Sequence, residues 1–245
     1  MKEEKLVAHI DIKLKKRQIL RRYLDLPKFV DFLRTGELYL EQASHFDDHL
    51  EGTLPEKIRQ SICELPDFLD SHGDPSIWEQ KNKNRTCLSC WTLGSKDNMA
   101  LWKIYGGTTK SVAITTTVNR LISVAPSWGK FGRVNVKKVR YINHAGHLPN
   151  GVYGLDESVF GLKHVAYSFE KEVRIVVTRQ IGEVPGPIRV PVNLDQFLLK
   201  IVVAPEAGNW FFDLVVDVAR RYNVLAPVHR SELPFLLNKA KVLHK

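Results

Sequence analysis

The chain has 245 residues and a formal net charge of +9 at pH 7, with 44% hydrophobic and 26% charged residues. This composition is typical of a soluble globular protein with a core of substantial size. No apolar run approaches the ~20 residues that a membrane-spanning helix needs, and residues 1–5 lack the apolar stretch of a signal peptide. The three cysteines are too few for a disulfide scaffold. We therefore expect a cytoplasmic protein without membrane contact.

The N-terminal half begins with a helix predicted over residues 26–35. Pro27 suits its first turn, and Gly36 is a typical residue just after a helix end. A strand is expected at 37–41, because apolar and polar residues alternate there. Residues 55–82 are polar with scattered apolar positions, which indicates a helical insertion.

The rest of the chain alternates between helices and strands. A helix is expected over 96–105, with Ser95 as its N-cap and Gly106-Gly107 as its end. A second helix is expected over 209–222, and 143–165 is expected to be a long loop with short structured segments. The remaining predicted strands are 111–118, 134–142, 169–177, 188–192, 199–203 and 224–228.

This mixture of elements predicts an α+β fold with mixed, mainly antiparallel sheets and flanking helices. We expect a single domain over 1–245, with a core of about 19–205. The helical insertion near 55–82 interrupts this core, and residues 206–245 form a C-terminal helix–strand extension.

The segment 169–177 carries the strongest functional signal. Apolar residues alternate with charged ones, which predicts a half-buried strand. On a strand that starts at the first of these residues, the side chains of Glu170, Glu172 and Arg174 point to one face. Two carboxylates and a guanidinium on a rigid strand suit an active site. The alternative is a plain ion pair between Glu172 and Arg174 on a solvated face.

Basic residues form three clusters, and such a field attracts polyanions. A nucleic acid or a phosphorylated cofactor would both satisfy it. The clusters are Lys13, Lys15, Lys16, Arg17, Arg21 and Arg22; Lys137, Lys138 and Arg140; and Lys239, Lys241 and Lys245.

Two segments contain residue types that metals use. Cys87 and Cys90 are spaced like half of a zinc site, but the sequence has no second cysteine pair. The loop 46–52 contains Asp47, Asp48 and Glu51, whose spacing fits no standard calcium loop. For this loop we favour a structural turn that orders a neighbouring pocket. We expect no metal site, and a zinc site at the cysteines stays open.

Several short motifs follow one another in a distinctive order over about residues 19–205. They are Arg22-Tyr23, 36–40, 44–48, 88–91, 99–105, 112–114 and 167–174. Their order resembles a large bacterial and phage family known only as a domain of unknown function, with Phe-Asn-Asp-Pro, Met-Trp-x-x-Tyr and Tyr-x-Lys-Glu-Trp-Arg motifs. Asp47, His49 and Val173 stand where that family has Asn, Pro and Trp.

The layout also resembles the ADP-ribosyltransferase fold. Arg22 ahead of the 26–35 helix matches the opening of that fold, and Glu170-Lys171-Glu172 matches its Glu-x-Glu motif. A Ser-Thr-Ser strand, which one branch carries, has no clear counterpart here. The resemblance implies an ADP-ribosyltransferase-like core with NAD as co-substrate.

The resemblance also implies roles for individual side chains. Cleavage of the nicotinamide–ribose bond passes through an oxocarbenium-like state, which Glu172 would stabilise while Glu170 orients or deprotonates the acceptor. The residues expected to hold NAD are Arg22, Tyr23, Trp102, Tyr105 and Arg174. For the aromatic residues, packing in the core is the alternative.

We therefore expect an NAD-consuming transferase that modifies a macromolecule in a toxin, defence or phage context. The positive charge favours DNA or RNA as acceptor, and a protein acceptor stays open. The alternatives are a non-catalytic nucleic-acid-binding module and a metal-dependent nuclease or phosphotransferase. We further expect Arg22 and Glu172 to reach one cleft, and the 96–105 helix to line a pocket. The oligomeric state is left open.

Overall fold

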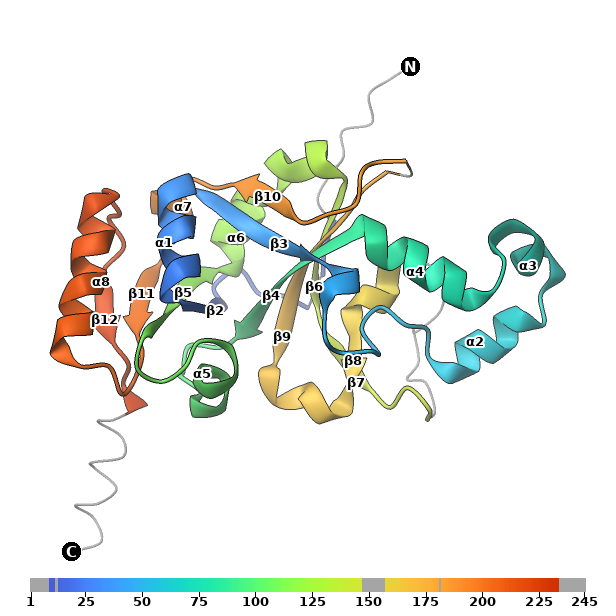
Figure 1. The fold of residues 1–245 in the computed structure, drawn as a ribbon, viewed down its shortest axis with the longest axis horizontal. Helices are drawn as coiled ribbons and strands as arrows, with labels where there is room; N and C mark the ends of the chain where they lie inside the picture. The colour runs from blue at the N-terminus through green and yellow to red at the C-terminus, as the bar shows by residue number, and fades with distance from the viewer. Residues whose placement is uncertain (1–8, 12, 147–156, 181, 234–245) are drawn as a thin grey trace, which may run out of the picture. The chain divides into compact units, whose positions relative to one another are not determined.

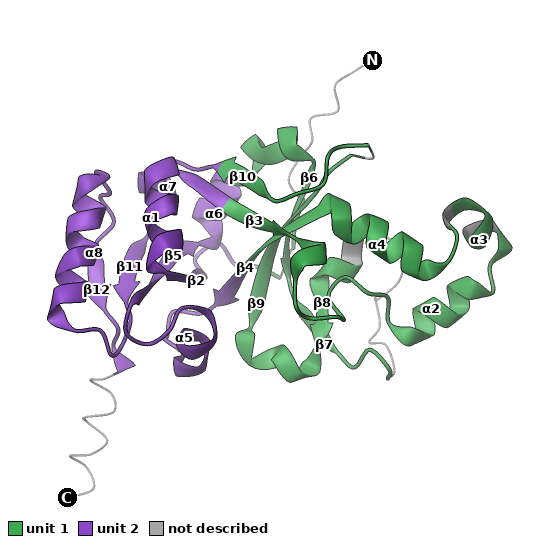
Figure 2. Cartoon of the chain, viewed as in Figure 1, with its two compact units in different colours: residues 1–14, 39–90, 125–190 green, residues 15–38, 91–124, 191–245 purple. Residues whose placement is uncertain are grey.

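The computed structural model describes residues 9–11, 13–146, 157–180 and 182–233 (Figure 1). The chain divides into two compact units, each built from three separate segments (Figure 2). Unit 1 comprises residues 1–14, 39–90 and 125–190, and unit 2 comprises residues 15–38, 91–124 and 191–245. Segments of the two units alternate along the chain, so neither unit is a continuous stretch of sequence. The single-domain organisation stays a prediction.

Unit 1 is built on a sheet in which β6 and β9 pair antiparallel. The strand β1 joins β6 in parallel, β4 neighbours β9, and β3 pairs antiparallel with β4. The strands β3, β4 and β10 have residues in both units. The strands with residues in unit 1 are β1 (His9–Ile10), β3 (Glu37–Gln42), β4 (Thr86–Leu93), β6 (Arg133–Lys138), β7 (Arg140–Ile142), β8 (Leu162–His164), β9 (Glu172–Thr178) and β10 (Ile188–Pro191).

Helices and short 3-10 turns complete unit 1. Three consecutive helices, α2 to α4, occupy the segment predicted as a helical insertion. Trp78 on α4 and Phe160 on η3 are buried in one apolar cluster with Val176 of β9, so this part of the core supports that strand. The helical elements are η1 (Ala43–His45), α2 (Glu56–Cys63), α3 (Pro66–His72), α4 (Pro75–Arg85), η2 (Ala125–Phe131), η3 (Glu157–Gly161) and η4 (Val165–Glu170).

Unit 2 is built on antiparallel pairs of β2 with β4, β2 with β5, and β5 with β11. The strand β12 adds to β11 in parallel. The strands with all their residues in this unit are β2 (Ile19–Asp25), β5 (Ser111–Thr117), β11 (Lys200–Val203) and β12 (Val228–Arg230). Its helices are α1 (Leu26–Thr35), α5 (Met99–Tyr105), α6 (Val118–Val124), α7 (Leu194–Phe197) and α8 (Asn209–Arg221).

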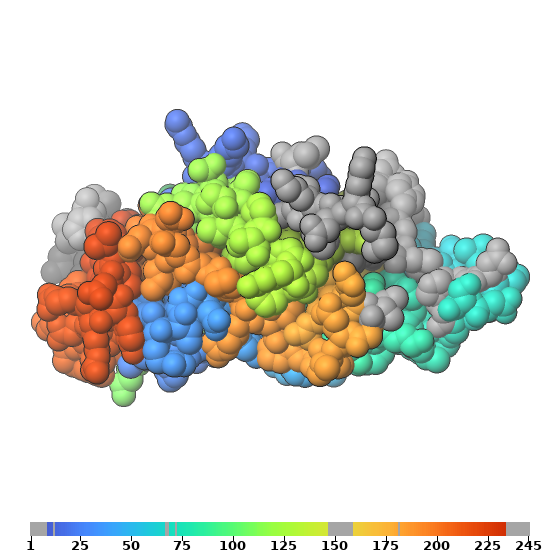
Figure 3. Space-filling view, turned by 90° about the horizontal axis from the view of Figure 1, so that it is seen from above, coloured from blue at the N-terminus to red at the C-terminus, as the bar shows by residue number. Residues whose placement is uncertain are grey.

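The helix α1 has the bounds that the sequence predicts. Asp25 caps its start by accepting a hydrogen bond from the backbone of Lys28 at 2.8 Å. Gly36 ends the helix with a φ of 63°, in the left-handed region that suits glycine. The helices α1 and α8 both reach the surface of unit 2 on the face seen in Figure 3. Each buries an apolar stripe, which includes Phe29 on α1 and Phe211 on α8.

The observed elements and their mostly antiparallel pairing confirm the predicted mixed α+β fold class.

Several predicted boundaries of helices and strands were wrong. Asn98, not Ser95, caps α5 through bonds to two backbone amides. The strand expected at 134–142 is interrupted at Val139, whose N–H bonds to the carbonyl of Glu172 instead of extending one strand. The last strand begins at Val228, because the chain first turns after α8 at Asn223, with a φ of 54°. In the described part of the chain, no helix has the length and apolar character to cross a membrane.

Candidate active site

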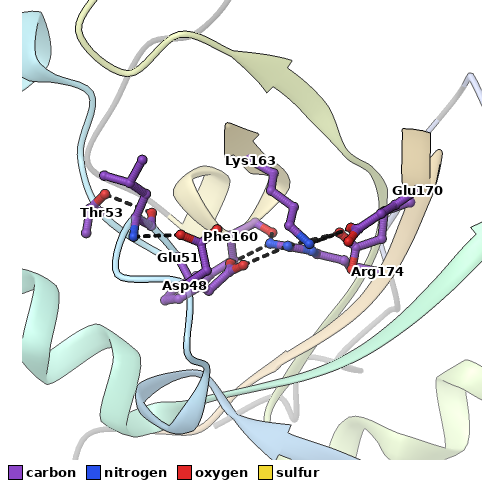
Figure 4. A network of polar contacts seen from close by, with 9 residues as sticks. Asp48, Glu51, Thr53, Phe160, Lys163, Glu170 and Arg174 are labelled. Carbon is purple, nitrogen blue, oxygen red and sulfur yellow. Dashed lines mark hydrogen bonds and ion pairs between the residues drawn. The ribbon is translucent and has the colours of Figure 1, made fainter. Parts of the chain in front are cut away.

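Arg174 on β9 is the centre of a buried polar network (Figure 4). Its guanidinium has no exposed surface. Nη1 and Nη2 donate to the two carboxylate oxygens of Glu51 at 2.5 and 2.7 Å, and Nη2 also donates to Glu172 at 3.0 Å. Nη1 donates further to the carbonyl of Phe160 at 2.9 Å. A two-pronged guanidinium–carboxylate pair of this kind fixes both position and direction.

The acidic loop 46–52 delivers Glu51 to this pair. The backbone N–H of Glu51 donates to the carbonyl of Asp48 at 2.9 Å, which closes a turn. Gly52 follows with a φ of +64°, and a Cβ at that position would lie 2.5 Å from the ring of Phe160. Only glycine therefore fits between the turn and that ring. The loop therefore forms a structural turn, and its role in ordering a neighbouring pocket stays a prediction.

This arrangement also bears on metal binding. Both oxygens of the Glu51 carboxylate are engaged by Arg174. Among the residues that the structure describes, no group of three or more His, Cys, Asp or Glu side chains is placed to hold a metal ion.

Glu170 and Glu172 come together, although not on one strand as expected. The strand β9 begins at Glu172, and Glu170 ends the 3-10 helix η4. Lys171 between them has a φ of 48°, so the chain turns there instead of remaining extended. Lys163 of β8 bridges the two carboxylates, with its Nζ 2.5 Å from Oε2 of Glu170 and 3.5 Å from Oε2 of Glu172.

The strand β9 is also more deeply buried than its alternating pattern indicated. Every residue from Glu172 to Thr178 is buried, so the prediction of a half-buried strand was wrong. Glu170 and Glu172 are each 4% exposed and Lys163 is 9% exposed. The alternative of a solvated ion pair between Glu172 and Arg174 is therefore also wrong. We call Glu51, Lys163, Glu170, Glu172 and Arg174 the Arg174 network.

The charges of the network shift its pKa values. Burial alone would raise the pKa of Glu172, but Arg174 and Lys163 outweigh burial and lower it below the usual value. Burial alone would lower the pKa of Lys163, yet Glu172 and Glu170 outweigh it and raise this pKa. The pKa of Arg174 is raised in the same way, mainly by Glu51 and Glu172 against burial. Glu172 is therefore a fixed negative charge at neutral pH.

Two further residues hold Glu172. The hydroxyl of Tyr141 on β7 accepts a hydrogen bond from the backbone N–H of Glu172 at 2.7 Å. Burial raises the pKa of Tyr141 to about 12, and the carboxylates of Glu172 and Glu170 add to this effect. The thiol of Cys90 donates to the Glu172 carboxylate, and burial together with that carboxylate raises the pKa of this thiol well above its usual value.

The two thiols that resembled half a zinc site have separate partners. Cys87 donates to the carbonyl of Gly186 at 3.3 Å, while Cys90 donates to Glu172. Residues three apart on a strand point to opposite faces. Burial raises the pKa of Cys87 to about 11 and that of Cys90 well above its usual value, which favours the neutral form of both thiols.

In unit 2, the arginine expected to bind NAD and its neighbour lie on different faces of β2. Arg22 is partly exposed, whereas Arg21 is 2% exposed. Arg21 forms an ion pair with Asp97 and donates to the carbonyl of Ser95 at 2.7 Å. The buried cation of this strand is thus Arg21, which anchors the loop before α5. NAD binding by Arg22 stays a prediction.

The aromatic residues expected to hold NAD differ in exposure. Trp102 on α5 has no exposed surface and packs edge-to-face on Tyr23, with 4.8 Å between ring centroids. Both rings belong to an apolar cluster with Ala113 and Val202. Tyr105, one turn later on α5, is 46% exposed. Trp102 therefore has the core position that was the alternative, and Tyr105 is the aromatic residue that a ligand can reach.

Sequence reasoning missed Lys163 and gave Glu51 and Cys90 other roles. Lys163 stands in Leu162-Lys163-His164, which carries no signal for a buried cation. Glu51 lies 123 residues from Arg174 along the chain. An acidic loop that ends in glycine is the only local signal for Glu51, and it does not identify the partner.

No family model and no curated protein matches the chain. Two solved structures of DarT from Thermus sp. 2.9 are similar to it. The complex with NAD+ has a TM-score of 0.42 and 10% identity, and covers 90% of this chain and 98% of that chain. The complex with carba-NAD+ has a TM-score of 0.39 and 9% identity, and covers 89% of this chain and 96% of that chain. Because both TM-scores lie below 0.5, the functional argument rests on the residues of the site.

Proposed function

We propose that this chain is an NAD-consuming protein of the ADP-ribosyltransferase type that modifies a macromolecule. The observation that carries the proposal is the Glu172 carboxylate at the start of β9. It is fixed in place by Arg174, Lys163 and Cys90, and its pKa is lowered. A preorganised negative charge in a water-poor site is what an oxocarbenium-like transition state requires.

The proposed reaction breaks the bond between the ribose C1′ atom and the nicotinamide nitrogen, and the electron pair leaves with nicotinamide. Glu172 stabilises the positive charge that develops on the ribose. The acceptor nucleophile forms a new bond to C1′ and gives its proton to Glu170, which lies beside Glu172 in the network. Lys163 contacts both carboxylates at 2.5 and 3.5 Å, so the two lie around one cation.

Within this proposal, Arg174 is a positioning residue and not a ligand of NAD. Its guanidinium is fully buried, and its donors are directed at Glu51, Glu172 and a backbone carbonyl. The expected roles of Arg22 and Tyr105 in holding NAD are part of the proposal, whereas Tyr23 is 7% exposed and packs against Trp102 in the core. An ADP-ribosyltransferase-like core is also part of the proposal.

For the acceptor we propose a nucleic acid, since the net charge of +9 favours a polyanion. The resemblance of motifs to a bacterial and phage family supports a toxin, defence or phage context. A binding module that has lost the reaction is the second candidate. The lack of solvent exposure at Glu172 favours it, because a carboxylate that is 4% exposed must be uncovered before it can meet ribose.

The test is Glu172→Gln, which keeps the shape of the side chain and removes its charge. With NAD labelled on its adenylate phosphate, we expect the wild-type protein to transfer label to a component of cell extract. The variant should lose ~100-fold or more of this turnover while remaining folded. Prior nuclease digestion should abolish labelling if the acceptor is a nucleic acid.

Glu183→Gln is the matched control, because Glu183 is an exposed glutamate of the same unit. It should leave turnover unchanged. Equal turnover in folded Glu172→Gln and in wild type would reject Glu172 as a catalytic group. No label transfer by the wild-type protein under any condition would favour the binding module.

A further inference from the structure

Lys163 occupies a position in the Arg174 network that the proposed reaction has not yet explained. It is a buried lysine, and its ammonium lies between the carboxylates of Glu170 and Glu172. The ring of Tyr167 lies 4.6 Å from its Nζ and forms a cation–π contact. A buried lysine that is not paired tends to lose its charge, whereas this one is surrounded by groups that keep it charged.

Within the Arg174 network, three carboxyl groups, from Glu51, Glu170 and Glu172, contact two cationic side chains. Arg174 directs both of its terminal nitrogens at Glu51 and one of them at Glu172. Lys163 contacts both members of the Glu170–Glu172 pair, so its removal would take one cation away from both carboxylates at once.

Two carboxylates that share one buried site repel each other, and normally one of them takes up a proton. A cation between the two carboxylates offsets their repulsion, so both can stay without a proton. The proposed reaction needs both carboxylates without a proton, Glu172 for charge stabilisation and Glu170 for proton uptake. A proton shared between the two would disable one of these roles.

We propose that Lys163 is a positioning residue that holds Glu170 and Glu172 side by side as a pair of carboxylates. Its effect on the pair does not depend on the identity of the substrate, whereas its effect on turnover rests on the proposed function. The other titratable or charged groups that face this pair come from several elements. Among the described residues, these groups include Glu51 from the acidic loop, Cys90 from β4, Tyr141 from β7, Tyr167 from η4 and Arg174 from β9.

The first experiment follows the carboxyl groups directly. Protein with ¹³C-labelled glutamate side chains is titrated by NMR, and the Glu170 and Glu172 signals are assigned from the two Glu→Gln variants. In Lys163→Met we expect one of these two signals to titrate at a higher pH than in wild type. Lys171→Met is the control, because Lys171 is an exposed lysine between the same two glutamates. It should leave both titrations unchanged, and unchanged titrations in Lys163→Met would overturn the proposal.

The second experiment measures NAD turnover. Lys163→Met should lower kcat by ~100-fold, the size of a typical general-base contribution, with a much smaller change in KM. The acidic limb of its pH–rate profile should move to higher pH, and Lys163→Arg should recover most of the activity. A variant that loses only stability would change neither the pH profile nor the balance between kcat and KM.

The two experiments separate the two proposals. If the wild-type protein turns over no NAD but the Lys163→Met titration shifts, the proposed function fails and the role of Lys163 in the carboxylate pair stands. If turnover is present and the titration does not shift, this inference fails and the function stands.

Should Lys163→Met not fold, Lys163→Ala can be studied in ethylammonium chloride, because ethylammonium supplies the missing cation. Ethylammonium should then restore folding where sodium chloride of equal concentration does not, and equal effects of both salts would overturn the proposal.

Discussion

Two arginines are buried on the described strands, one in each unit, and their surroundings differ. Arg21 on β2 is paired with the carboxylate of Asp97 and a backbone carbonyl. Burial lowers its pKa in spite of nearby negative groups. Arg174 on β9 has Glu51 and Glu172 around it, and these carboxylates raise its pKa against the effect of burial.

This difference distinguishes the structural role of Arg21 from the place of Arg174 in the candidate site. One cation and one carboxylate are enough to tie the loop before α5 to β2. The Arg174 network instead gathers three carboxyl groups from separate parts of unit 1 around two cations. Because desolvated charges are costly unless they are paired, each group of this network depends on the others for its partner.

The largest expected effect distinguishes the two arginines by double substitution. Arg174→Met or Arg21→Met alone should destabilise the protein by ~3–5 kcal/mol, since each leaves buried carboxylates without their partner. Arg21→Met with Asp97→Leu removes the whole pair and should return to within ~1 kcal/mol of wild type. Arg174→Met with Glu51→Leu should remain destabilised, because Glu172 still lacks its guanidinium. Urea unfolding measures the free energy of unfolding of all four variants. If both double variants regained wild-type stability, the proposed difference between Arg21 and Arg174 would be rejected.

The next largest effect concerns the aromatic residues of α5. Trp102→Ala should cost ~3–5 kcal/mol, as large cavities in a core do, because Trp102 is fully buried against Tyr23. Tyr105→Ala should change stability by less than ~0.5 kcal/mol, since Tyr105 is 46% exposed. If Tyr105 holds NAD, its substitution should raise KM for NAD at unchanged kcat. An unchanged KM for NAD in Tyr105→Ala would reject the prediction that Tyr105 holds NAD.

A smaller effect should appear in the acid stability of unit 1. The folded pKa of Glu172 is lowered, so its contribution to stability is present above its unfolded value of about 4.3. This contribution is lost as the pH falls through the lower folded pKa. Glu172→Gln should therefore flatten the decline of the melting temperature below about pH 4.3. The exposed Glu183→Gln should leave that decline as in wild type, and identical slopes in both variants would show that Glu172 is not stabilised as an anion.

The smallest effect tests strain at the two non-glycine residues with positive φ in the described part of the chain. Lys171 in unit 1 has a φ of 48° and Asn223 in unit 2 has a φ of 54°. A positive φ is less favourable in free energy for lysine than for asparagine. Lys171→Gly should therefore stabilise the protein by up to ~1 kcal/mol, and Asn223→Gly should change stability less. Equal gains at both positions would show that the turn between Glu170 and Glu172 stores no special strain.

The sequence by itself determined those features that neighbours along the chain control. The helix α1 has its expected bounds because Asp25, Pro27 and Gly36 act on the backbone within one turn. The fold class followed from periodic patterns in the same way. The pattern around β9 also identified Glu170, Glu172 and Arg174 as residues that belong together.

Only the tertiary structure decided how these three residues are used. A charged residue in an alternating strand normally faces water, so the sequence indicated an exposed face where β9 is buried throughout. The partners that make this burial tolerable lie far along the chain or carry no pattern: Glu51 is 123 residues from Arg174, and Lys163 stands in a segment without a functional signal. Local propensities act over a few residues, whereas the choice of counter-ions in a desolvated site depends on which elements pack together.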